Sequence, residues 1–146
     1  MKRIFGLGLL VVALFAAAAF GAEFGRLSID VANGWNASQD GSTVAITRSD
    51  NTAAMTVTLE SQGGASLEAL AAEWSKQLGG NQPEQITEGD FAGDYMFAFT
   101  NAQGVNGECL LSGDGTDYIV VMVIGTDNNP DAEAEAMAMF KSIALK

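Results

Sequence analysis

The chain has 146 residues, a hydrophobic content of 48% and a formal net charge of −11, and it contains one cysteine and no histidine. A chain of this length is large enough to bury one core of ordinary size. One thiol forms no intramolecular disulfide, and without histidine the chain lacks the common general base and the commonest metal ligand. The composition therefore argues against Ser-His-Asp catalysis, Cys-His catalysis and ordinary zinc sites.

Acidic side chains dominate the chain after its amino-terminal segment. Lys2 and Arg3 lie in that segment, and the remainder contains five basic against eighteen acidic side chains. Nucleic acids and anionic membranes bind clustered Lys and Arg side chains, so we expect neither as a partner. The composition instead favours solubility and association with cations or with basic protein surfaces.

The amino-terminal segment has the layout of a secretory signal peptide. Met1–Arg3 is basic, Ile4–Ala22 carries no charge, and the run ends in small residues. A small-x-small sequence at positions 19–21 predicts a leader of residues 1–21, although cleavage after Ala18 also fits. An uncleaved anchor is the alternative, because the apolar run approaches the ~20 residues that span a bilayer. We expect a periplasmic or secreted protein that keeps no stable membrane anchor once the leader is removed.

The first half of the mature chain indicates a strand, a turn and a hairpin. Arg26–Val31 alternates as a short strand, and an Asn-Gly turn follows over 32–36. Thr43–Arg48 and Ala53–Leu59 then form a hairpin with one apolar face. The residues expected to point inward from this hairpin are Val44, Ile46, Met55, Val57 and Leu59.

Two helices are predicted by apolar residues at helical spacing. The first is capped by Ser66 and ends at Gly79–Asn81. The second opens with an Asn129 cap and Pro130 and runs to Ala144, with cations near its carboxyl end. The apolar stripe of each helix is expected to pack on a sheet.

A central strand is predicted over Asp117–Thr126, because both of its faces are apolar and rich in β-branched residues. Asp94–Thr100 and Gly107–Ser112 precede it as strands of an antiparallel meander, and Glu84–Asp90 is a weak, polar edge strand. These elements predict one α+β domain over residues 22–146. Its sheet is expected to be mainly antiparallel, with six or seven strands, and to be flanked by the two helices.

Four short segments, in the order in which the predicted strands and helices follow one another, resemble those of a known fold family. They are Ile29–Trp35, Ala53–Leu59, Ser66–Ala71 and Phe140–Ile143. With the order of strands and helices, they resemble the PsbP-like fold of the extrinsic PsbP subunit of photosystem II, a nuclear Ran-binding factor and DcrB-like exported bacterial proteins. The DcrB-like proteins are the most similar in style, although they usually carry a lipid anchor, and no cysteine lies near the leader exit here. The resemblance implies an α/β/α sandwich used mostly for protein association, and it transfers no functional residue.

Two acidic turns bracket the predicted central strand. Asp114 and Asp117 precede the strand, and Asp127 and Asp131 follow it. With Trp35, these carboxylates form the interaction surface that the sequence predicts. Turn formation and helix capping explain the acids without a metal. A calcium site is the alternative, but the spacing of an EF-hand is absent. Trp35 itself is interpreted as an apolar plug at the edge of the core, with ligand stacking as the alternative.

The remaining candidates for chemistry are weak. Cys109 shares a strand face with Leu111, so we interpret it as a small buried hydrophobe. Nothing selects a catalytic pair among the eighteen acids. We therefore predict no catalytic residue, cofactor or metal, and a non-enzymatic accessory protein that binds an unidentified protein through an acidic surface. A periplasmic small-ligand or calcium module with a pocket between helices and sheet, and an enzyme that uses carboxylates alone, are the alternatives.

Overall fold

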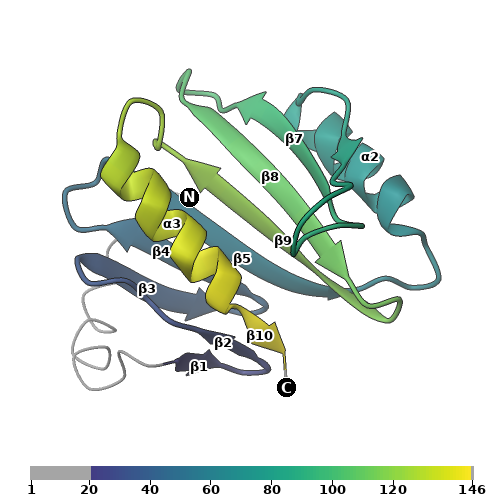
Figure 1. Cartoon of the computed structure of the whole chain (residues 1–146), viewed down its shortest axis with the longest axis horizontal. Helices are drawn as coiled ribbons and strands as arrows, with labels where there is room; N and C mark the ends of the chain where they lie inside the picture. Colours follow the sequence, from purple (N-terminus) through teal and green to yellow (C-terminus); the bar gives the residue numbers. More distant parts are fainter. Residues whose placement is uncertain (1–20, 146) are drawn as a thin grey trace. The chain divides into compact units, whose positions relative to one another are not determined.

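The computed structural model describes residues 21–145, so the predicted leader lies outside the described residues except for Gly21. The strands form a seven-stranded sheet in the order β3-β4-β5-β9-β8-β7-β6 and a three-stranded sheet in the order β1-β2-β10 (Figure 1). The predicted α+β class, with two helices and mostly antiparallel strands, is confirmed. The elements follow one another as β1 (Ala22–Phe24), β2 (Leu27–Ile29), β3 (Trp35–Asp40), β4 (Thr43–Arg48), β5 (Ala54–Ser61), α2 (Leu67–Leu78), β6 (Glu84–Gln85), β7 (Tyr95–Thr100), β8 (Asn106–Gly113), β9 (Asp117–Ile124), α3 (Pro130–Ser142) and β10 (Ala144–Leu145).

The chain divides into two compact units, which we describe separately. Unit 1 combines the chain up to Thr56 with the chain from Gly125 onward, and unit 2 is Val57–Ile124. Unit 1 contains β1 to β4, the start of β5, α3 and β10. Unit 2 contains the rest of β5, α2 and β6 to β9. Unit 1 joins segments from both ends of the chain, and the prediction of one domain over residues 22–146 stays a prediction.

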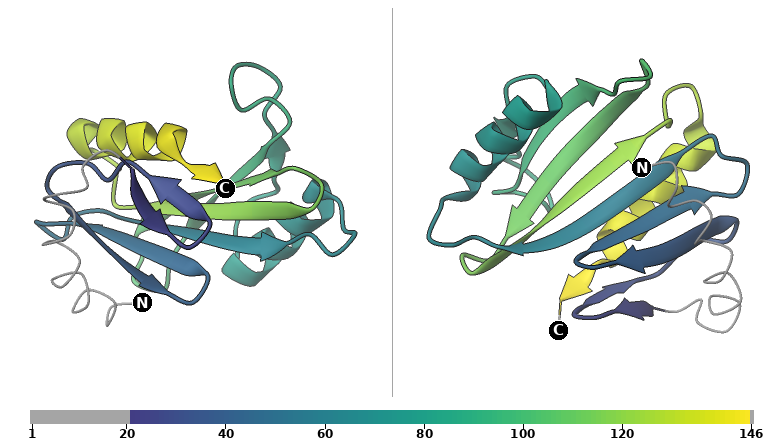
Figure 2. Two further views of the ribbon diagram at one scale, coloured as in Figure 1. Left: turned by 90° about the horizontal axis from the view of Figure 1, so that it is seen from below. Right: turned by 180° about the vertical axis from the view of Figure 1, so that it is seen from behind.

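Unit 1 contains the three-stranded sheet and α3. β2 is its middle strand, with Ala22 of β1 opposite Ile29 on one side and Ala144 of β10 opposite Ser28 on the other. α3 packs against β2, and Figure 2 shows this helix running directly into β10. The Asn129 cap is confirmed, since its Oδ1 accepts a hydrogen bond from the Ala132 N–H at 3.2 Å. The helix ends at Ser142, two residues before the predicted end.

β3 is a strand that the sequence analysis missed. It begins at Trp35, inside the segment predicted as a turn, and pairs with β4 from Trp35 opposite Arg48 to Asp40 opposite Thr43. Ala37 and Ser38, which point to opposite faces, are both buried. In β4, the four consecutive residues Val44–Thr47 are buried, so the expectation of a hairpin with one solvated face is wrong for this strand. The sequence of β3 is mostly small and polar, and it forms a strand because the rest of the fold covers both of its faces.

Unit 2 packs α2 on one face of β7 and β8 (Figure 1). The predicted ends of α2 are confirmed: Ser66 Oγ accepts from the Ala69 N–H at 3.1 Å, and Gly79 adopts the left-handed conformation with φ 66°. Beneath the helix lies one apolar cluster from four elements. Its buried members are Ala71, Phe97, Phe99, Cys109, Leu111, Tyr118 and Val120.

β9 is the fourth of seven strands, so the predicted central strand is confirmed. Four consecutive residues, Tyr118–Val121, are buried, which means that both faces of the strand are covered there. β6 is shorter than predicted, because the chain leaves the sheet after Gln85. The segment Ile86–Asp94 forms a loop closed at its base, where the Ile86 N–H donates to the Asp94 carbonyl at 2.8 Å and the Gly93 N–H to the Ile86 carbonyl at 2.7 Å.

Candidate interaction surface

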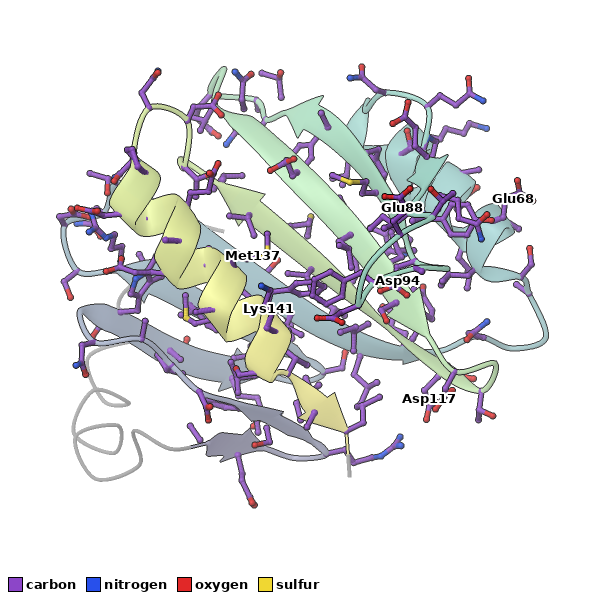
Figure 3. All side chains as sticks on the ribbon, viewed as in Figure 1. Glu68, Glu88, Asp94, Asp117, Met137 and Lys141 are labelled. Carbon is purple, nitrogen blue, oxygen red and sulfur yellow. The ribbon has the colours of Figure 1, made fainter. Side chains whose placement is uncertain are left out.

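The turn between β8 and β9 uses Asp114 to hold its own backbone. Asp114 Oδ1 accepts hydrogen bonds from the N–H groups of Thr116 and Asp117, each at 2.8 Å. The buried Gln62 side chain closes the turn from the end of β5, with its Oε1 accepting from the Gly115 N–H at 2.8 Å. Asp117 is half-buried and is the first residue of β9 (Figure 3). Asp114 therefore has a structural role that the sequence analysis offered as the alternative to a site.

The turn after β9 serves mainly to begin α3. Besides capping the helix through Oδ1, Asn129 donates from Nδ2 to Thr52 Oγ1 at 3.4 Å. Asp131 lies in the first helical turn, where a negative charge suits the helix dipole. Asp127 is exposed. This turn belongs to unit 1 and the β8–β9 turn to unit 2, so the four predicted carboxylates divide between the units in two pairs.

Trp35 is buried in the core of unit 1, so it is not part of the interaction surface that the sequence predicts. Its exposed fraction is 3%, and its indole Nε1 donates to Glu135 Oε1 at 3.0 Å. The same oxygen accepts from Arg48 Nε at 3.1 Å, and Arg48 Nη1 also pairs with Asp50 at 2.8 Å. Since both the ring and its donor are engaged, the interpretation as a core plug is confirmed and the ligand-stacking alternative has no accessible ring.

Two titratable groups are buried in the core of unit 2. Burial raises the pKa of the Cys109 thiol to about 12, so the thiolate that nucleophilic chemistry requires does not form at neutral pH. The interpretation of Cys109 as a buried hydrophobe is confirmed. Tyr118 accepts a hydrogen bond from Trp74 Nε1 at 3.0 Å and donates a long one of 3.5 Å to Glu60. Burial raises the pKa of Tyr118, and the negative charge of Glu60 raises it further.

The acidic excess of the protein is concentrated in unit 2. Val57–Ile124 contains ten acidic side chains and a single basic one, Lys76. Eight of the ten acids are exposed, and the other two, Asp94 and Asp117, are partly buried. Lys76 lies in the last turn of α2, so β6 to β9 and their connections carry no basic side chain. Every charged side chain on these strands and turns is therefore acidic.

The sheet of unit 2 has a second face, which α2 does not cover. Residues directly opposite one another on antiparallel strands share a face, and Met96 lies opposite Leu110, which lies opposite Val121. Glu84 of β6 lies on the other side of Met96. These four side chains form one row across four strands. Val121 is buried, so this face is accessible only over β6 to β8. We call the accessible part the open face, which comprises Glu84, Asp94, Met96, Ala98, Glu108, Leu110 and Ser112, all exposed or partly exposed.

Three carboxylates surround the Met96–Leu110 pair on the open face. Glu84 lies opposite Met96, and Glu108 lies opposite Ala98, one diagonal step from Met96. Asp94 precedes Met96 by two positions on the same face, and its carboxylate accepts a hydrogen bond from the Ser112 side chain. Opposite side chains in a sheet lie about 5 Å apart and diagonal ones about 7–8 Å. A ligand resting on Met96 and Leu110 would therefore lie within reach of all three acids.

The loop Ile86–Asp94 adds charge beside this face. Its exposed Glu88 and Asp90 lie near the tip, while Phe91 is half-buried. Figure 2 shows the loop projecting from the strands β6 and β7 that it connects, and Figure 3 places Glu88 and Asp94 along it. Burial raises the pKa of Asp94, although the hydrogen bond from Ser112 partly offsets this effect.

Residues 21–145 contain neither a metal-binding cluster of side chains nor a helix suited to cross a membrane. No three or more acidic or cysteine side chains in this range are grouped so that they could hold a metal ion. Within the same range, neither helix has the length and apolar character needed to cross a membrane.

The chain is similar in fold to a solved bacterial structure. No protein-family model matches the chain, and no curated protein does. A protein from Bacteroides thetaiotaomicron VPI-5482, with a crystal structure at 1.50 Å resolution, aligns with a TM-score of 0.56 and 15% sequence identity. The alignment covers 83% of this chain and 45% of that chain, so the present chain spans less than half the length of its structural relative. At this identity the likeness shows a shared fold, and the resemblance to PsbP-like and DcrB-like proteins stays a prediction.

Proposed function

We propose that the protein is an exported, non-enzymatic accessory protein that binds a basic protein partner through the acidic surface of unit 2. The observation that carries this proposal is the ratio of ten acidic to one basic side chain in Val57–Ile124, with eight of the acids exposed. A surface of one sign raises the association rate of partners of the opposite sign and repels others.

The non-enzymatic part of the proposal is supported by the roles that reactive groups have in the fold. Cys109 is buried with a raised thiol pKa, and Asp114 is engaged by backbone N–H groups of its own turn. The chain contains no histidine. The export part rests on the leader predicted at residues 1–21, and the role in protein association agrees with the resemblance to the PsbP-like fold.

Binding to proteins of opposite charge tests this proposal. The protein would be immobilised and presented with a small basic protein and an acidic protein of similar size, at 20 mM and at 300 mM salt. We expect only the basic protein to bind, and we expect its affinity to fall at least tenfold at high salt, because the Debye length shortens from about 20 Å to below 8 Å. Binding of both proteins alike, or of neither at low salt, would remove the proposal.

Crosslinking in the cell envelope extends the test to natural partners. Fusion of the leader to a reporter would first establish export, since the reporter is expected to become active only outside the cytoplasm. Crosslinked partners are expected to contact unit 2 with basic surfaces. Crosslinks that map to acidic surfaces of the partner, or to unit 1 alone, would contradict the assignment.

A further inference from the structure

We infer that the open face of unit 2 docks an amphipathic helix of the partner that carries both apolar and basic side chains. The apolar side chains of this helix would rest on Met96 and Leu110, and its basic side chains would pair with Glu84, Asp94 and Glu108. This inference rests on the proposed function, because it names the surface and the partner chemistry through which the acidic unit would act.

The apolar part of the argument comes from the contiguity of the large side chains. Met96 and Leu110 are directly opposite one another on neighbouring strands, and both are partly exposed although α2 packs on the other face of the same strands. Exposed Ala98 extends the apolar area along β7. Scattered exposed apolar residues are ordinary, but a contiguous patch bordered by polar groups is typical of interaction sites. Methionine adapts its shape to a partner more easily than branched side chains do.

The charge around this patch selects the partner. The three carboxylates of Glu84, Asp94 and Glu108 border it, and β6 to β9 and their connections contain no lysine or arginine. A basic side chain that approaches Met96 would meet these carboxylates without competition from a basic residue of the same surface. A second copy of this chain would instead bring three carboxylates against three, which is unfavourable.

The dimensions of the patch suit a helix. The accessible row Glu84, Met96, Leu110 crosses two strand spacings, which is roughly 10 Å at about 4.8 Å per spacing. An α-helix rises about 5.4 Å per turn, so about two turns cover the row. Apolar residues at positions i, i+4 and i+7 of such a helix would face the patch, and basic residues beside them would reach the acids on its border.

Three designed peptides separate the parts of this inference. The first is a helical peptide of leucine and lysine, the second replaces lysine with glutamate, and the third replaces leucine with serine. Binding to the whole protein would be measured by calorimetry and mapped by chemical-shift changes of backbone amides. We expect the leucine–lysine peptide to bind at least tenfold more tightly than either other peptide, with the largest shifts at Met96, Ala98, Glu108 and Leu110.

Two variants with the same change of charge locate the site. Glu84→Lys with Glu108→Lys changes the open face, whereas Glu68→Lys with Glu73→Lys changes exposed positions of α2 in the same unit. We expect the first pair to weaken binding of the leucine–lysine peptide at least tenfold and the second pair to weaken it less than threefold. Circular dichroism and the urea midpoint would verify that both variants are folded.

The outcomes distinguish this inference from the proposed function. Equal loss in both double variants, or shifts centred on α2, would overturn the docking site while leaving an acidic binding protein. If the serine–lysine peptide binds as tightly as the leucine–lysine peptide, apolar contacts with Met96 and Leu110 do not contribute, and the inference of a docked amphipathic helix is wrong. A dimer that Leu110→Arg dissociates, or contact of this face with residues 1–20, would assign the face to another occupant and overturn the inference. Failure of every basic peptide and of the basic protein would overturn both proposals.

Discussion

The two faces of the unit 2 sheet are made from the same strands but carry different chemistry. The face under α2 presents an apolar cluster that includes Phe97, Cys109, Leu111 and Val120, and α2 packs on it. The open face mixes Met96 and Leu110 with carboxylates. Because successive side chains on a strand point to opposite faces, a single step along β8 moves from one chemistry to the other. The difference indicates that the face under α2 stabilises the fold, and the open face is where we propose that association takes place.

The largest expected effect comes from Leu111→Ala, which tests the covered face directly. Leu111 is fully buried, so its truncation should lower the free energy of unfolding by about 3 kcal/mol. Leu110, its neighbour in sequence, is half-exposed, and Leu110→Ala should cost about 1 kcal/mol or less. Urea unfolding of both variants measures the contrast, and losses of equal size would break the comparison between the faces.

Gly107→Ala should be the next most damaging change. A Cβ at this position would lie 2.7 Å from Phe99 Cζ and 2.8 Å from Ile124 Cγ2, so the aromatic ring must move. We expect a loss of about 2 kcal/mol, in the range of overpacked core positions. Glu108→Ala on the open face is the matched control and should change stability by no more than about 0.5 kcal/mol. A harmless Gly107→Ala would mean that the covered face is not closely packed.

Much of the covered face could be predicted from the sequence. The alternation of Tyr95, Phe97 and Phe99, and the helical spacing over residues 67–78, both indicated apolar surfaces that bury one another. The caps at Ser66 and Asn129 were also correct, because a cap depends on residues within one turn of the helix. Such local features can be predicted because the residues that cause them are neighbours in the sequence.

The open face could not be predicted in the same way, because it depends on strand register. Alternation along each strand places Met96 and Leu110 opposite the residues of the covered face, but their neighbours Glu84 and Glu108 became apparent only from the pairing. A slip of one residue would place different side chains together. The sequence therefore pointed to the acidic turns, where four aspartates lie close together along the chain, but the Asp114 carboxylate accepts hydrogen bonds from the backbone of its own turn. Trp35 was misplaced for a similar reason, since the burial of β3 comes from tertiary cover.

Trp74→Phe tests a polar contact between α2 and the sheet beneath it. The variant keeps an aromatic ring but removes the 3.0 Å hydrogen bond from Trp74 Nε1 to the Tyr118 hydroxyl, and it should cost about 1 kcal/mol. That hydrogen bond lowers the pKa of Tyr118 against the raising effect of burial, so the pKa should rise further in the variant. A double-mutant cycle with Tyr118→Phe isolates the pair. A coupling energy near zero would show that the contact contributes only packing.

Asp94→Asn gives the smallest expected effect and bears on the open face. Burial raises the pKa of Asp94 above the ordinary aspartate value of 3.8, so the folded state binds this proton more tightly than the unfolded state. The stability that protonation contributes is fully present below pH 3.8 and is lost as the pH rises through the folded pKa. Asparagine is neutral at every pH and keeps an acceptor for Ser112. Asp94→Asn should therefore raise the urea midpoint at pH 7 and leave it nearly unchanged at pH 3.

Asp90→Asn is the control for Asp94→Asn, because it removes one negative charge from the exposed part of the same loop. If Asp90→Asn raises the urea midpoint at pH 7 as much as Asp94→Asn does, the effect comes from general charge repulsion within unit 2. If only Asp94→Asn raises the urea midpoint, the loss of stability comes from the partly buried carboxylate beside Met96. In that case the open face holds an ionised group at the expense of stability, which is expected where a charge serves binding and not folding. The leucine–lysine peptide should then bind Asp94→Asn more weakly although that variant is the more stable protein.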